Sequence, residues 1–92
     1  MVFLISYDLI GEHKDYEAAE RVIHAASKGR CVRCLKSTWL IRSDIESPAE
    51  MKELLESFMD SDDQFLVVEI VNELHGRLPQ DVLAEIRTIQ AR

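Results

Sequence analysis

The succession of apolar patterns along this 92-residue chain predicts an α+β sandwich. Apolar runs that favour β-structure occur around residues 2–7, 30–43 and 64–71, and two amphipathic helical patterns lie between them. A third helical pattern ends the chain, and no linker-like or repeated segment divides it. We therefore expect a single domain over residues 1–92, with a core at 1–72 and an added C-terminal helix at 78–92.

The first strand and the first helix are marked by their apolar patterns. Residues 2–7 are almost continuously apolar, which predicts burial on both faces, or one face on the core and the other in a subunit contact. Asp15 is placed to cap a helix that runs to about Lys28, and Gly29 stands where a C-cap glycine belongs. The apolar stripe of this helix consists of Tyr16, Ala19, Val22, Ile23 and Ala26.

Two further segments favour β-structure. Residues 30–43 are rich in β-branched and aromatic side chains, but the polar pair Lys36 and Ser37 interrupts them. This segment forms either two short strands or one strand with a bulge at the pair. Residues 64–71 predict another strand, in which Leu66, Val68 and Ile70 share one face.

The second helix has the clearest start signal in the chain. Ser47 is the expected N-cap, Pro48 takes the first helical position, and Glu50 completes a capping box. The stripe of Met51, Leu54, Leu55 and Phe58 predicts a helix that ends near residue 59. The helix expected behind Pro79 is too polar for a second core, so we expect it to dock on the sheet or on a partner.

The order β-α-β-β-α-β with an added helix points to a ferredoxin-like sandwich, in which two helices cover one face of an antiparallel sheet. The other face of that sheet must be solvated or covered. Phe3, Ile5, Trp39 and Val67 are too apolar for a wet face unless they point at the helices. Homodimerisation through the sheet is the simplest way to cover what remains.

The composition restricts the function and the compartment. The net charge is −6 and the pI is about 4.9, which argues against a general nucleic-acid coat protein. A basic segment that holds Lys28, Arg30, Arg33 and Lys36 still allows local binding of a polyanion. No run approaches the ~20 apolar residues of a membrane span, no signal peptide is evident, and two cysteines fit a cytoplasmic location with free thiols.

Several chemical motifs favour structural interpretations. Cys31 and Cys34 form a CxxC, but no second ligand pair with zinc spacing accompanies it. A redox CxxC opens a helix, whereas this one lies in β-favouring sequence, where positions i and i+3 point to opposite faces. The acidic residues 60–63 are interpreted as a solvated turn rather than a calcium loop. Trp39 is interpreted as a core or interface residue rather than a base-stacking platform.

Asp8 and Ser37 are the residues whose roles the pattern leaves open. Asp8 ends the first strand, either as a turn-former or as a carboxylate that a metal or substrate reaches. In the expected topology the first and third strands are central neighbours. This brings the segments "SYD" and "KST" toward each other.

Two motifs resemble those of a known superfamily. The segments "FLISYDLIG" and "CLKSTWLI", with a helix between them and the later strand "FLVVEIV", are similar to small ferredoxin-like proteins over residues 1–72. That superfamily contains the CRISPR-associated Cas-two proteins, the virulence-associated protein D toxins and a short SinR-like group. Its members carry a Gln-x-Ser-Val-aromatic segment, in which this chain has Leu35 for the glutamine and Thr38 for the valine.

The resemblance implies a homodimer in which first-strand aspartates from both subunits face each other. In members reported as nucleases this pair holds a divalent cation such as Mg²⁺, which is chemically sensible because one carboxylate alone is a poor magnesium site. By this resemblance Asp8 would be the metal ligand and catalytic residue. Ser37 would contact the phosphate, and Tyr7 would help to shape the site.

These observations lead to two hypotheses about function. The first is a metal-dependent endoribonuclease or other nuclease that hydrolyses RNA or DNA at a homodimer interface around Asp8. The second is a non-catalytic dimeric scaffold or interaction module, with residues 31–41 and the C-terminal helix as contact surfaces. Only the nuclease hypothesis requires phosphate binding, which needs Arg30, Arg33 and Lys36 on the rim beside Asp8.

Overall fold

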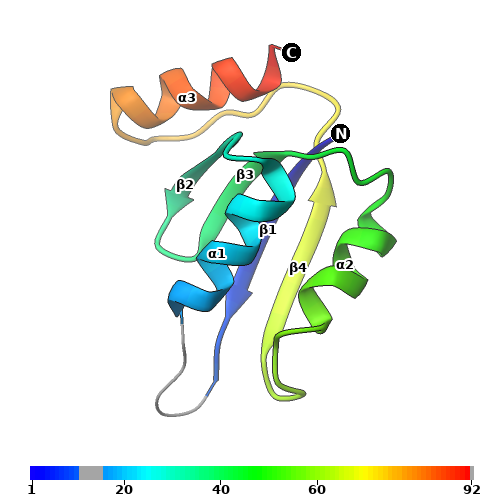
Figure 1. Ribbon diagram of the computed structural model, residues 1–92. Helices are drawn as coiled ribbons and strands as arrows, with labels where there is room; N and C mark the ends of the chain where they lie inside the picture. The colour runs from blue at the N-terminus through cyan, green and yellow to red at the C-terminus, as the bar shows by residue number, and fades with distance from the viewer. Residues whose placement is uncertain (11–15, 92) are drawn as a thin grey trace.

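The computed structural model describes residues 1–10 and 16–91, and it confirms an α+β fold of the order β-α-β-β-α-β-α (Figure 1). The four strands form one antiparallel sheet in the order β2-β3-β1-β4. The expected N-cap Asp15 and its preceding loop lie outside the described residues. The elements are β1 (Val2–Asp8), α1 (Tyr16–Ser27), β2 (Cys31–Leu35), β3 (Thr38–Arg42), α2 (Pro48–Glu56), β4 (Gln64–Glu69) and α3 (Gln80–Gln90).

Strands β2 and β3 form a hairpin, so the first of the two alternatives for residues 30–43 is correct. Lys36 and Ser37 make its turn, because Leu35 pairs directly with Thr38. A register irregularity does occur, but it falls at Cys34, between the paired residues Arg33 and Leu35. The polar pair therefore ends one strand and begins the next, and the bulge lies inside β2.

Local capping residues end helix α1 and begin helix α2. Gly29 adopts φ 81°, and its N–H donates to the carbonyl of His24 at 3.0 Å, which confirms the predicted C-cap of α1. At α2, Ser47 Oγ accepts from the N–H of Glu50 at 3.2 Å. The Glu50 carboxylate turns back to the N–H of Glu46 rather than to that of Ser47. Helix α2 ends at Glu56, a little before the predicted end.

Helices α1 and α2 cover one face of the sheet and enclose what we call the helix-face core. Alternate residues of β1 enter it, and so do Trp39 and Ile41 of β3. Val67 packs against it from β4, so the most apolar strand residues do point at the helices. Its buried members are Phe3, Ile5, Tyr7, Ala19, Ile23, Trp39, Ile41, Met51 and Leu55.

Helix α3 packs on the opposite face of the sheet, over β2 and β3. Ile86 and Ile89 of α3 join Val2 and Leu40 in a second core. The C-terminal helix therefore docks on the sheet of its own chain, which decides between the two expected positions. Within the described residues, no helix is both long and apolar enough to cross a membrane.

One arginine ties α3 to the sheet. Arg42 donates from Nε to the carbonyl of Ile89 at 2.8 Å and from Nη2 to that of Gln90 at 3.2 Å. These carbonyls belong to the last turn of α3, where a cation also meets the negative end of the helix dipole. The side chain of Gln90 adds a hydrogen bond to the carbonyl of Asn72.

We expect Arg42→Ala to lower the free energy of unfolding by about 1–3 kcal/mol, because two hydrogen bonds from a charged donor are lost. Chemical denaturation measures this loss, and amide hydrogen exchange locates it in α3. Arg87→Ala is the matched control, because it removes an exposed guanidinium from the same helix and should cost less than about 0.5 kcal/mol. Equal losses in both variants would show that Arg42 does not anchor α3.

Candidate functional site

Asp8 is the last residue of β1 and lies exposed at one end of the sheet. Its backbone is in register with Gln64 of β4. Because Tyr7 enters the helix-face core, Asp8 projects from the opposite face, together with Leu4 and Ser6. This is the face on which α3 packs, but α3 lies over β2 and β3.

The predicted approach of the segments "SYD" and "KST" is confirmed. Ser6 pairs with Thr38, and their hydroxyl oxygens are 3.0 Å apart. The N–H of Tyr7 donates to the carbonyl of Ser37 at 3.0 Å. The turn that holds Ser37 and Lys36 therefore lies beside the end of β1.

Tyr7 is buried on the other side of the sheet from Asp8. Its hydroxyl oxygen accepts a hydrogen bond from Nε1 of Trp39 at 3.2 Å, and its ring lies 6.1 Å from that of Tyr16. Trp39 is buried as well, as its interpretation as a core residue predicts. Tyr7 supports the end of β1 from within the core, and its side chain does not share a surface with Asp8.

Arg30 lies at the far end of the sheet from Asp8. Arg30 immediately precedes β2, and its carbonyl accepts from the N–H of Arg42, which pairs with Val2 at the start of β1. Val2 and Asp8 are six positions apart along β1, roughly 20 Å at the usual rise per residue. Arg30 instead donates from Nη2 to Asp44 at 3.4 Å and from Nε to the carbonyl of Ser27 at 3.1 Å.

Asp44 forms ion pairs with two of the four cations of the basic segment. Lys28 Nζ lies 2.9 Å from Asp44 Oδ2, and Arg30 contacts the other carboxylate oxygen. The hydrogen bond from Lys28 and its charge, followed by those of Arg30, hold the pKa of Asp44 below its usual value. The positive charge at this end of the sheet is thus partly neutralised within the chain.

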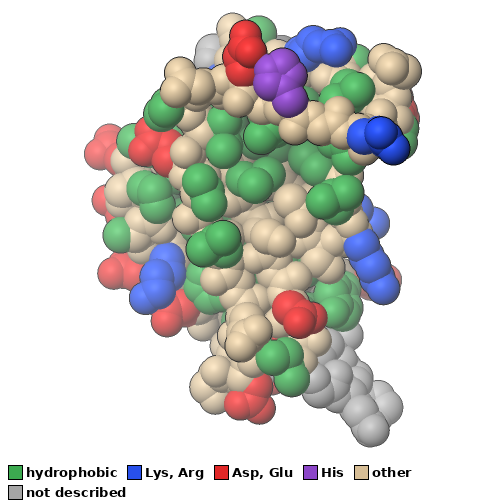
Figure 2. Space-filling model, turned by 180° about the vertical axis from the view of Figure 1, so that it is seen from behind, with side chains coloured by type: hydrophobic (Ala, Val, Ile, Leu, Met, Phe, Trp, Pro, Cys, Tyr) green, Lys and Arg blue, Asp and Glu red, His purple; other side chains and the backbone are tan. Residues whose placement is uncertain are grey.

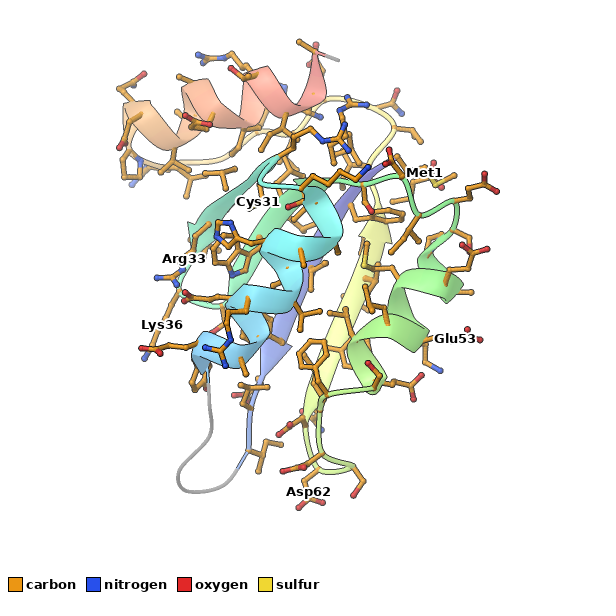
Figure 3. All side chains as sticks on the ribbon, in the orientation of Figure 1. Met1, Cys31, Arg33, Lys36, Glu53 and Asp62 are labelled. Atoms are coloured by element: carbon orange, nitrogen blue, oxygen red, sulfur yellow. The ribbon has the colours of Figure 1, made fainter. Side chains whose placement is uncertain are left out.

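Arg33 is on the helix side of the sheet. Its guanidinium forms an ion pair with Glu20 of α1 and lies 5.1 Å from the centre of the Trp39 ring. Arg33 and Lys36 both project at the outer edge of the β2 hairpin (Figure 3). Of the three cations that phosphate binding requires, only Lys36, in the β2–β3 turn, is at the same end of the sheet as Asp8.

The described residues of one copy do not form a complete divalent-cation site around Asp8. Among residues 1–10 and 16–91, no group of three or more His, Cys, Asp or Glu side chains has metal-binding geometry. Asp8 offers a single carboxylate, with the amide of Gln64 opposite it on the neighbouring strand. A hard cation needs more oxygen ligands than these two side chains of the described residues offer.

The two cysteines lie on opposite faces of β2, as the predicted alternation requires. Cys31 packs against the helix-face core with its Sγ 3.5 Å from Nδ1 of His24, whereas Cys34 packs against the second core. Both are free thiols, and burial raises the pKa of each above its ordinary value. The reactive thiolate is therefore disfavoured, which fits structural cysteines.

Asp63 has a role that the sequence pattern did not reveal. Its Oδ1 accepts from the N–H of Ile10 and its Oδ2 from the N–H of Asp60, both at 3.0 Å. The acidic segment is thus a turn, as predicted, and it also holds the chain that leaves Asp8. An Asp at the last position of a four-residue acidic turn is the available sequence signal, but the contact with Ile10 spans 53 positions.

The second feature that the sequence did not fully reveal is an uncovered apolar surface beside Asp8. We call it the open half-sheet. Leu66 is 64% exposed and Val68 is 38% exposed, although both belong to a strand of the sheet. Figure 2 shows hydrophobic side chains gathered on this side of the molecule. The open half-sheet consists of three cross-strand pairs: Leu4 with Val68, Ser6 with Leu66, and Asp8 with Gln64.

Comparison with known proteins assigns no family to this chain. It matches no family model, no curated protein and no solved structure.

Proposed function

We propose that this protein is a ferredoxin-like homodimeric interaction module related to the Cas-two and virulence-associated protein D superfamily. Three features support the relationship: the order β-α-β-β-α-β, the strand order β2-β3-β1-β4, and two helices on one face of the sheet. The "ISYD" and "KSTW" segments, on which the resemblance depends, are also adjacent through the pairing of β1 with β3.

The open half-sheet is the observation that carries the proposal. An exposed aliphatic strand face next to a free sheet edge is unusual in a stable monomer and typical of a contact surface. Burial of a leucine contributes on the order of 2 kcal/mol, whereas an exposed ion pair contributes about 0–1 kcal/mol. Leu66 and Val68, rather than the charged rim, therefore supply the driving force for association.

A second copy of the chain is the occupant that fits this surface best. In a two-fold symmetric contact the same patch takes part on both protomers. A small apolar patch therefore buries apolar area on each of them. Helix α3 already covers the β2–β3 half of the same face. Only the strands β1 and β4 then remain for the partner, which gives the contact a defined position.

The distribution of charge supports an interaction module over an enzyme that acts on nucleic acid. Arg30 is bound to Asp44 at the far end of the sheet, and Arg33 is bound to Glu20 on the other face. Of these residues and Lys36, only Lys36, in the β2–β3 turn, is at the same end of the sheet as Asp8. With a net charge of −6, the chain offers little electrostatic attraction for a phosphate backbone.

We expect the wild-type protein to be a dimer and Leu66→Glu to be a monomer, because dimerisation would bury two carboxylates without partners. Sedimentation equilibrium measures the change, with the dissociation constant rising by at least about a hundredfold. Ala25→Glu is the matched control, since it adds the same charge to the exposed surface of α1 on the other side of the sheet. A monomeric wild type, or a dimer of unchanged strength in Leu66→Glu, would refute the proposed contact.

A metal-dependent nuclease is the second candidate function, and the exposed position of Asp8 on the open half-sheet favours it. Two Asp8 carboxylates from a pair of copies would both be available as ligands for Mg²⁺. The bound ion would provide Lewis-acid activation for hydrolysis of a phosphodiester in RNA or DNA. Ser37 and Lys36 lie at the Asp8 end of the sheet, where they could contact a phosphate. Tyr7 is buried on the other face, Arg30 lies at the far end of the sheet, and Arg33 lies on the helix side.

A cleavage assay separates the two functions. We expect no magnesium-dependent cutting of labelled single-stranded RNA or DNA by the wild type beyond that of Asp8→Asn. Asp62→Asn is the control, because it removes an exposed carboxylate from the 60–63 turn. Cutting that needs magnesium and falls at least about a hundredfold in a folded, dimeric Asp8→Asn variant, but not in Asp62→Asn, would establish the nuclease instead.

A further inference from the structure

A hollow lies between α3 and the second face of the sheet. It has a volume of about 250 Å³, and residues 74–78, which lead into α3, close one side of it. Its walls are mostly aliphatic side chains, with one thiol and Thr38. They come from the sheet and from α3, and they include Leu4, Cys34, Leu78, Leu83 and Ile86.

The rim of this hollow carries the charged and titratable groups. His75 and Arg77 both line it. His75 Nε2 lies 2.8 Å from a carboxylate oxygen of Glu73, so its position is tied to an acidic partner. In the part of the chain that the structure describes, no carboxylate forms an ion pair with Arg77. The hollow thus combines an apolar interior with one unpaired guanidinium at its edge.

The chemistry of the walls and rim defines the class of ligand. Apolar walls favour a hydrocarbon, and the lining contains no Phe, Tyr or Trp within the described residues on which an aromatic ring would stack. The volume is below the roughly 300–1,000 Å³ of pockets for drug-sized molecules, so the ligand is small. The planar guanidinium of Arg77 matches a carboxylate through two parallel hydrogen bonds.

We propose that this hollow binds a medium-chain aliphatic carboxylate, with its hydrocarbon chain between α3 and the sheet and its carboxylate on Arg77. The site is separate from the open half-sheet, although Leu4 borders both. It does not depend on dimerisation, because every wall belongs to one chain. Occupancy would fill the space beneath the first turns of α3 and so hold that helix on the sheet.

The two cysteines provide an internal reporter for this site. Cys34 is in the wall of the hollow, whereas Cys31 is on the other face of β2 and outside it. Alkylation by iodoacetamide, followed by mass spectrometry of the two cysteine peptides, measures the access to each thiol. Octanoate below its micelle concentration is the probe, and octanol and phenylacetate are the comparison molecules.

We expect saturating octanoate to slow the alkylation of Cys34 by at least about fivefold and to leave Cys31 unchanged. Octanol and phenylacetate should protect Cys34 less at equal concentration. Arg77→Gln should weaken the binding of octanoate, measured by calorimetry, about tenfold, without affecting that of octanol. Lys52→Gln, which removes an exposed cation from α2, is the matched control and should have no effect.

Any of the following results would overturn the proposal. Octanoate that protects neither thiol, or both alike, would show that the hollow is not its binding site. Equal binding of octanoate and octanol, unchanged in Arg77→Gln, would show that the carboxylate is not recognised. The same measurements in Leu66→Glu separate this site from the dimer contact, because Cys34 protection should persist in the monomer.

Discussion

The structure depends on the central strand β1, which is apolar on both faces and has a neighbour on each side. Phe3, Ile5 and Tyr7 enter the helix-face core, while Val2 and Leu4 contact the second core or its border. A slip of one residue in its pairing would exchange these two sets. The register with β3 and β4 therefore fixes both cores at once, and it also fixes the face on which Asp8 appears.

The second face of the sheet has a covered part and an exposed part, because α3 is anchored at one place. Arg42 holds its C-terminal end above β3, and Ile86 and Ile89 bury Leu40 beneath it. Strand β4 receives no such cover, so Leu66 and Val68 remain exposed beside Asp8. One face thereby carries two separate features: an apolar hollow under α3 and an exposed strand surface with apolar side chains next to it.

Much of the fold could be predicted because its determinants are local. The cap residues Gly29 and Ser47, the turn at residues 36–37 and the apolar stripes each act within a few positions. The candidate site was harder, because it depends on which strands are neighbours and which face each residue takes. Arg30 and Arg33 are close to Ser37 in sequence, yet one lies at the other end of the sheet and the other on its helix side. The pattern of α3 showed that it must bury one face, but its partner Arg42 lies 47 positions from Ile89.

We propose that the open half-sheet is the contact between two copies of this chain. Isotope-filtered nuclear Overhauser spectroscopy on an equal mixture of labelled and unlabelled protein tests it most directly, because only contacts between protomers give signals. We predict signals from the methyl groups of Leu4, Leu66 and Val68. An absence of such signals at millimolar concentration, or signals only from methyl groups of α1 and α2, would show that the open half-sheet is not a contact between protomers.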